Sequence, residues 1–242
     1  MNSTYLRLEI LRTFRNRRFF VFSLIIPVLF FYLIAGSNKD AELAGIPFAA
    51  YYLAGMTSFG TMAAMLANGG RISGERAVGW NRQLRMTPLR PASYFSAKLT
   101  SAYIMAVVTL ALLLVAGLTL GVREQLTGVF AMVGYFAVGL IPFAALGIFI
   151  GHKFTPDSIG PILGGGVSVL AFLGGAWGPV GGTSGVLHDL SQATPTYWLV
   201  EAGHVLIGGP GWSGKGWVVV AVWSLVLGRL ALAAYRSDTK RQ

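Results

Sequence analysis

Six long apolar stretches, separated by short polar segments, constrain the fold of this 242-residue chain more than any other feature of its sequence. A helix needs roughly 20 apolar residues to cross the hydrocarbon core of a bilayer. Each stretch is close to that length, and backbone in lipid must satisfy its hydrogen bonds internally. We therefore expect an all-α integral membrane protein, with residues 1–242 forming one transmembrane domain. The predicted spans are residues 19–36, 47–67, 99–121, 128–151, 158–178 and 216–235.

The basic residues are distributed unevenly between the two sides that six crossings would define. Sixteen of the 19 Lys and Arg residues fall on the side that holds both termini, and Lys39, Arg123 and Lys215 fall on the other. By the positive-inside rule, both termini are expected in the cytoplasm. We expect the membrane to be a bacterial inner (plasma) membrane. The net charge of +10 then sets topology beside anionic lipid headgroups, and no nucleic-acid partner is expected.

The segment before the first span, residues 1–18, has helical periodicity. Leu6, Ile10, Leu11 and Phe14 recur at helical spacing, with arginines between and after them. This pattern is typical of an amphipathic helix that lies at the membrane interface, here on the cytoplasmic side. A simple basic anchor for the first span is an equally open alternative.

The longest cytoplasmic stretch between spans, residues 68–98, is predicted to hold one short helix over Glu75–Met86. Thr87-Pro88 would end it, because proline cannot continue a helix and disfavours helical backbone before it. Both ends of such a helix are tied to membrane spans, so it is well placed to press against a cytoplasmic partner. The alternative is that its arginines only fix the topology.

The residues of this stretch resemble a known family. Glu75-Arg76, Gly79, Leu84, Thr87-Pro88 and Ala97-Lys98-Leu99 are similar to the cytoplasmic motif of ABC type-2 transporter permeases, and most similar to their drug- and antibiotic-efflux branch. Ala77 departs from that motif, where an acid is common, as does Trp80-Asn81. The resemblance implies that 75–86 is a coupling helix that docks on a separate ATP-binding subunit. The residues implied in docking are Glu75, Arg76, Gly79, Arg82, Leu84, Arg85, Thr87 and Pro88.

The same resemblance implies the partners. Two copies of the ATP-binding subunit would hold ATP and magnesium, and a second permease subunit, identical or different, would complete the transporter. This chain itself would bind no cofactor and no metal. The glycine-rich segment 209–216 nearly matches a P-loop, but it has Gly216 where that motif needs Ser or Thr.

The segment 179–215 is neither apolar enough to span a membrane nor polar enough for a plain loop. The resemblance implies that it is an extracytoplasmic re-entrant hairpin between spans five and six. Pro195, Tyr197 and Trp198 belong to its Pro-x-x-aromatic element, which is expected to help close the outer end of a path.

The function expected from these features is that of a permease subunit of an ATP-driven exporter for amphipathic or hydrophobic substrates, such as drugs, antibiotics or lipid-linked molecules. Met56, Phe59, Met62 and Tyr103 are candidates to line its path. The alternatives are an ion-coupled carrier or channel, and a lipid-modifying membrane enzyme. Ion-coupled carriers place ionisable residues or broken helices near the midplane, and the predicted spans hold almost no ionisable residue. Such an enzyme would need polar residues clustered at one depth, and none are evident.

Overall fold

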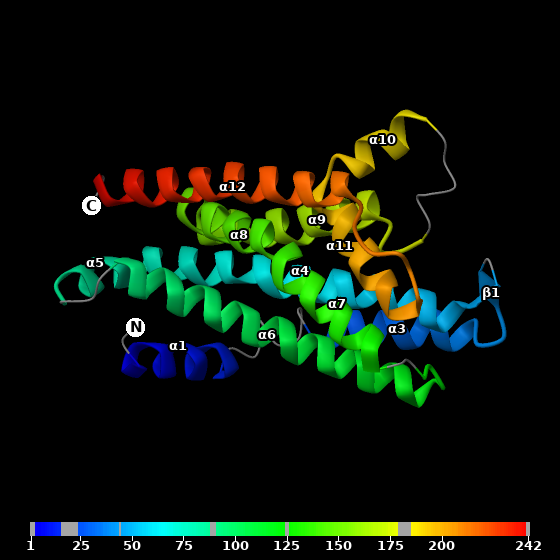
Figure 1. The fold of residues 1–242 in the computed structure, drawn as a ribbon. Helices are drawn as coiled ribbons and strands as arrows, with labels where there is room; N and C mark the ends of the chain where they lie inside the picture. The colour runs from blue at the N-terminus through cyan, green and yellow to red at the C-terminus, as the bar shows by residue number, and fades with distance from the viewer. Residues whose placement is uncertain are drawn as a thin grey trace.

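The computed structural model describes residues 3–15, 24–43, 45–87, 91–123, 126–178 and 185–240. The long helices of this part of the chain run roughly side by side in one bundle (Figure 1). The start of α1 and the end of α12 lie at the same end of the bundle as α5, and β1 lies at the opposite end. The described helices in the first half of the chain are α1 (Ser3–Arg15), α3 (Ile26–Ser37), α4 (Phe48–Ala77), α5 (Trp80–Arg85) and α6 (Pro91–Thr119).

The second half of the chain supplies the remaining described helices. They are α7 (Leu126–Gly139), α8 (Ile141–Lys153), α9 (Pro156–Gly174), α10 (Val186–Gln192), α11 (Pro195–His204), the 3-10 helix η2 (Val205–Ile207) and α12 (Gly214–Lys240). Proline stands in the first turn of α8, α9 and α11, where its missing N–H has no helical partner to lose.

Among the described residues, four helical segments are long and apolar enough to cross a membrane by length and composition. They are Ser93–Thr119, Leu126–Lys153, Pro156–Gly174 and Gly214–Asp238. These segments overlap the predicted third to sixth spans. The predicted first span overlaps α3, whose 12 residues are apolar but short, and its residues 19–23 lie outside the described part.

The predicted second span corresponds to α4, which is the longest described helix, with 30 residues, but not apolar enough to meet the same test. Its composition follows from its position, because α4 packs against α3, α6, α8, α9 and α11 and is buried along most of its length. Small and polar residues can occupy such a helix where they find partners. Ser58 donates to the Leu199 carbonyl at 3.0 Å, and Asn68 donates to the Lys98 carbonyl at 3.2 Å.

Glycines bring α4 and α8 close together. A Cβ added to Gly69 would lie 2.5 Å from the carbonyl oxygen of Gly147, and one added to Gly151 would lie 2.7 Å from that of Gly69. The Gly147/Gly151 pair thus packs within the chain, as small residues four apart often do. Gly160 and Gly164 of α9, at the same spacing, would meet nothing within 4 Å.

The described structure is mostly helical, consistent with the predicted all-α membrane protein. Two short strands, β1 (Glu42–Leu43) and β2 (Ile46–Pro47), form an antiparallel hairpin between α3 and α4. The predicted span 128–151 lies within the apolar segment Leu126–Lys153, which has a one-residue interruption between α7 and α8. Pro142 sits in the first turn of α8 and has no N–H to donate to the preceding turn, which accounts for the interruption.

Candidate functional site

The connection between α4 and α6 lies at the end of the bundle that also holds the end of α12 (Figure 1). Here α4 ends at Ala77, and Gly79 adopts a left-handed conformation with φ 71°. Residues with a Cβ rarely adopt this conformation, which lets the chain turn sharply from α4 into α5. The helix α5 then has six residues, and the Thr87 hydroxyl donates to the Leu84 carbonyl at 2.6 Å just beyond its end.

The turns on either side of α5 expose apolar side chains. Val78 is 74% exposed and Met86 is 79% exposed, which are high values for large apolar residues. Gln83 and Thr87 are also exposed, whereas Leu84 is half-buried. The segment 78–87 therefore presents a small apolar and polar surface at the end of the bundle.

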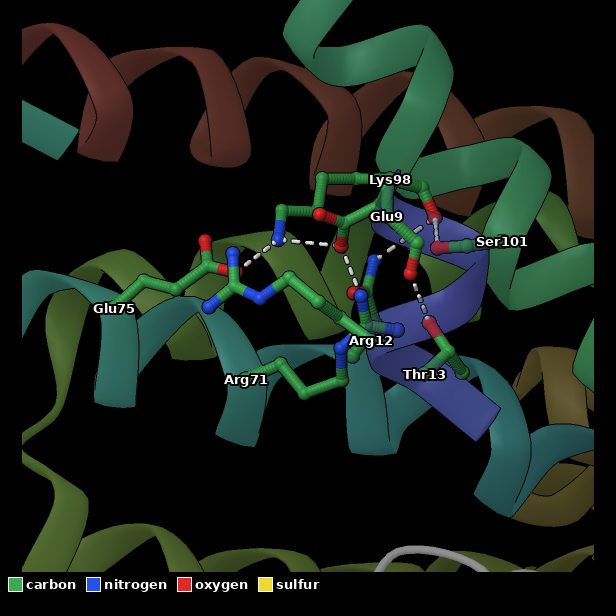
Figure 2. Close-up of polar contacts among 8 residues, drawn as sticks. Glu9, Arg12, Thr13, Arg71, Glu75, Lys98 and Ser101 are labelled. Carbon is green, nitrogen blue, oxygen red and sulfur yellow. Dashed lines mark hydrogen bonds and ion pairs between the residues drawn. The ribbon is translucent and has the colours of Figure 1, made fainter. Parts of the chain in front are cut away.

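A buried group of charged side chains lies directly behind this surface. Lys98 Nζ of α6 lies 2.7 Å from Glu9 Oε1 of α1 and 2.6 Å from Glu75 Oε1 of α4. Arg71 of α4 forms a further ion pair with Glu9, and Arg12 of α1 approaches Glu75 at 3.5 Å. Figure 2 shows the Lys98 ammonium between the two carboxylates. We call Glu9, Arg12, Arg71, Glu75 and Lys98 the ion cluster.

Most of the ion cluster is shielded from solvent, and Arg12 is the exception, with 48% of its side chain exposed. The side chains of Glu9, Glu75 and Lys98 are 1%, 5% and 0% exposed. Burial acts to raise the pKa of Glu9, but Lys98 and Arg71 outweigh it, so this pKa lies below its ordinary value and the carboxylate is ionised at neutral pH. A buried charge of this kind persists only where partners compensate its desolvation, and the two carboxylates here have three cations around them.

The ion cluster fixes how α1 lies on the bundle. Glu9 and Thr13 are buried on one side of α1, and Leu8, Leu11 and Phe14 are exposed on the other. The helix therefore differs from an ordinary amphipathic helix, because its buried side carries the charged Glu9 and its exposed side is partly apolar. Arg12 also lies over the ring of Trp80, with 5.1 Å between Cζ and the ring centroid, and so joins α1 to α5.

A second ion pair connects the end of α4 to the end of α12. The Arg76 guanidinium donates to both oxygens of Asp238, each at 2.9 Å, and to the carbonyls of Gly151 and Phe154. His152 Nδ1 lies 3.2 Å from the same carboxylate. Arg76 thus satisfies carbonyl groups that the end of α8 leaves without helical partners, while it holds α12.

The single predicted helix over Glu75–Met86 is wrong in its boundaries. Glu75 and Arg76 belong to the last turns of α4, and the left-handed Gly79 interrupts the helix before Trp80. Glu75 is buried in the ion cluster, and Arg76 is paired with Asp238, so neither side chain is presented at the surface of α5. Arg82, Leu84 and Arg85 do lie in α5, and Pro88 lies outside the described residues.

The predicted outer hairpin contains α10, α11 and η2, and its residues 179–184 are outside the described part. Pro195 begins α11, and the Thr194 hydroxyl accepts a hydrogen bond from the Tyr197 amide at 3.4 Å, as an N-cap does. Trp198 holds the segment together: its indole donates to the Gln192 carbonyl, and its own carbonyl accepts from the Trp212 indole.

The residues predicted to line a path lie inside the bundle. Met56, Phe59 and Met62 of α4 are 0%, 8% and 2% exposed and belong to the main hydrophobic core. Tyr103 of α6 donates from its hydroxyl to the Ala137 carbonyl of α7 at 2.8 Å. In this arrangement the first three fill space between helices, and Tyr103 bonds α6 to α7. Their role in a path stays a prediction.

Sequence reasoning missed Glu9, Arg71 and Asp238 as partners of the motif residues. One signal was available for Glu9, because it is the only acid among six Lys, Arg, Asp and Glu residues in the first 18 positions. An isolated carboxylate in a basic helix is a candidate for a specific ion pair. Its partner Lys98 stands 89 residues further along the chain, and no local pattern predicts a contact at that separation.

These features describe a helical, multi-pass membrane protein with a short exposed helix braced at one end of its bundle. Residues 3–207 match the family model of the ABC-2 type transporter, and the chain belongs to this family of membrane transport components. A relative from Bacillus subtilis (strain 168), described as "Putative transport permease YvfS", is 28% identical over 211 residues, which cover 84% of this chain and 85% of the relative. The predicted membership of the ABC type-2 permease family is thus confirmed.

Proposed function

We propose that this chain is the permease subunit of an ATP-driven exporter, and that a separate ATP-binding subunit docks on the segment 78–87 around α5. Family membership supports a transport permease that works with an ABC ATP-binding subunit. In the finer proposal, the chain crosses a bacterial inner membrane six times, with both termini in the cytoplasm. Two ATP-binding subunits and a second permease subunit, identical or different, complete the transporter.

The observation that carries the proposal is the contrast between the exposed turns of α5 and the fixed residues behind them. Val78 and Met86 are exposed, yet Glu75 and Lys98 on the flanking helices are held in the ion cluster. A force on α5 would therefore not be lost in a flexible loop. It would be passed to α4 directly, from α4 to α6 and α1 through the ion cluster, and to α12 through Arg76 and Asp238.

The proposed cargo is an amphipathic or hydrophobic molecule, such as a drug, an antibiotic or a lipid-linked compound. The low charge content of the predicted spans and the many exposed apolar residues on α3, α6 and α12 favour substrates that partition into the bilayer. ATP and magnesium would be bound by the partner. In the proposed mechanism, ATP-driven closure of the two partner subunits moves α5, and a path opens between the two permeases, with the segment around Pro195, Tyr197 and Trp198 closing its outer end.

The docking proposal is tested by co-purification and ATPase measurements in liposomes with a co-expressed ATP-binding subunit. Val78→Ser and Met86→Ser should each reduce both the amount of partner recovered and the transporter-dependent ATPase activity by roughly threefold to tenfold, since each removes much of an exposed apolar contact worth about 1 kcal/mol or more. Val186→Ser is the matched control, because Val186 is 77% exposed but lies on α10. Equal recovery from all three variants would contradict docking at α5.

A further inference from the structure

The two halves of the apolar segment Leu126–Lys153 have different neighbours. Within the described residues, α8 packs mainly against α4 and α12, whereas α7 packs mainly against α11 and η2. Most residues of α8 are buried, and Phe143 and Ile148 of this helix belong to hydrophobic core clusters. In α7, by contrast, Leu126 and Phe130 are each 73% exposed. The half-span α8 is thus part of the bundle interior, and α7 lies on its outside.

Several close contacts hold α8 in place. A Cβ added to Gly147 would lie 2.9 Å from a backbone carbonyl oxygen of α4, so the two helix backbones touch. The Arg76 guanidinium donates to the Gly151 carbonyl at 3.1 Å, and His152 Nδ1 lies 3.2 Å from the Asp238 carboxylate of α12. Movement of α8 would break these contacts, so this half of the span is expected to stay with α4 and α12.

The backbone between α7 and α8 is weakened at the junction formed by residues 139–142. Pro142 has no N–H, so the Val138 carbonyl, four residues earlier, receives no helical hydrogen bond from it. Beside it, the Ala137 carbonyl accepts a hydrogen bond from the Tyr103 hydroxyl of α6 at 2.8 Å. Sharp bends in helices occur mostly at proline. The junction therefore suits a pivot, and the Tyr103 hydroxyl bonds the end of α7 that lies next to it.

We propose that α7 pivots about this junction as a movable cover over α11 and η2, while α8 stays fixed and the Tyr103 hydroxyl restrains the pivot. Within the described ranges, α6 packs mainly against α1, α3 and α4, so the Tyr103 hydrogen bond can break without disturbing the main contacts of α6. The covered helix α11 contains Pro195, Tyr197 and Trp198, which are predicted to close the outer end of a path. The pivot is a property of this chain alone, so it does not rest on docking at α5.

The test is double electron–electron resonance of the purified full-length chain in liposomes. The chain has no cysteine, so nitroxide spin labels can be attached at pairs of introduced cysteines. Leu225→Cys of α12 carries one label of each pair, and the other is on Phe130→Cys of α7 or, as the matched control, on Lys153→Cys of α8; all three positions are exposed. Since a helix rises about 1.5 Å per residue, a pivot of about 15° would move Phe130, about ten residues from the junction, by about 4 Å.

The distance distribution of the α7 pair should be wider than that of the α8 pair. Tyr103→Phe removes the restraining hydroxyl and should widen the α7 distribution further, with the α8 distribution unchanged. Pro142→Ala supplies the N–H that a continuous helix needs, so it should narrow the α7 distribution. The proposal is overturned if the α7 pair is as narrow as the α8 pair without either substitution, if either substitution leaves the α7 distribution unchanged, or if Tyr103→Phe widens both distributions alike.

Discussion

At the scale of single residues, Lys98 is a fully buried cation between carboxylates that come from two other helices. Its position explains how a lysine can lie within the apolar segment Ser93–Thr119. Desolvation of the ammonium is offset by Glu9 and Glu75, and each carboxylate has an arginine as a second partner. Charge pairs of this kind are costly to break from one side, because the remaining partner stays buried.

Replacing Lys98 with methionine should therefore destabilise the protein strongly. Lys98→Met keeps most of the side-chain volume but leaves Glu9 and Glu75 without their shared ammonium, and about 3–5 kcal/mol of stability should be lost. Thermal unfolding of the detergent-purified chain measures this loss as a lower Tm. Lys215→Met is the control, because Lys215 is exposed and its ammonium donates to Gln192. Similar Tm values for the two variants would contradict the role of the ion cluster.

The sequence could identify some of these residues but not what they contact. Glu75, Arg76 and Lys98 were singled out by their resemblance to a family motif, yet the motif does not say that Glu75 and Arg76 face inward. The deciding contacts join residues far apart in the chain, such as Arg76 and Asp238, which are separated by 162 positions. The direction of the side chains at the end of α4 depends on where this helix ends. The predicted helix began at Glu75, whereas α4 continues to Ala77, so Glu75 and Arg76 were assigned to the wrong helix.

At the scale of elements, α4 organises the bundle. It is long, rich in small residues and buried against five other helices. The segments that contain α6, α8, α9 and α12 could be predicted from hydropathy, because each is long and apolar enough to cross a membrane. The position of α4 could be predicted, but its burial could not. The sequence shows that this span contains Thr, Ser and Asn, but it does not show which helices accept hydrogen bonds from their side chains.

The contact between α4 and α8 depends on glycine at its closest point. Gly69→Ala would place a methyl carbon 2.5 Å from the Gly147 carbonyl oxygen, so the two helix backbones must move apart. We expect a loss of about 1–3 kcal/mol, as for other overpacked cores, despite the better helix propensity of alanine. Thermal unfolding in detergent again measures the change.

Gly164→Ala provides the comparison for this prediction. A Cβ at Gly164 would meet nothing within 4 Å, so the substitution makes no clash and should leave Tm unchanged or slightly raised. If Gly69→Ala were as harmless as Gly164→Ala, the close packing of α4 on α8 would not be a determinant of stability.

At the scale of the whole molecule, the two ends of the bundle have different chemistry. The end with α5 holds the ion cluster and the Arg76–Asp238 pair, which join α1, α4, α6 and α12 close to an exposed surface. The opposite end has the hairpin and the segment around Trp198, where indole N–H groups donate to backbone carbonyls. Buried ion pairs thus brace the proposed docking end.

Site-specific cross-linking can test whether an ATP-binding subunit contacts the turn after α5. The chain has no cysteine, so Met86→Cys can carry a single short photoreactive cross-linker in membranes that also contain a co-expressed ATP-binding subunit. Val186→Cys, on α10, serves as the control with a similarly exposed position. We expect a cross-link to the ATP-binding subunit from position 86 and none from position 186. No cross-link from position 86, or equal cross-links from both positions, would contradict docking at α5.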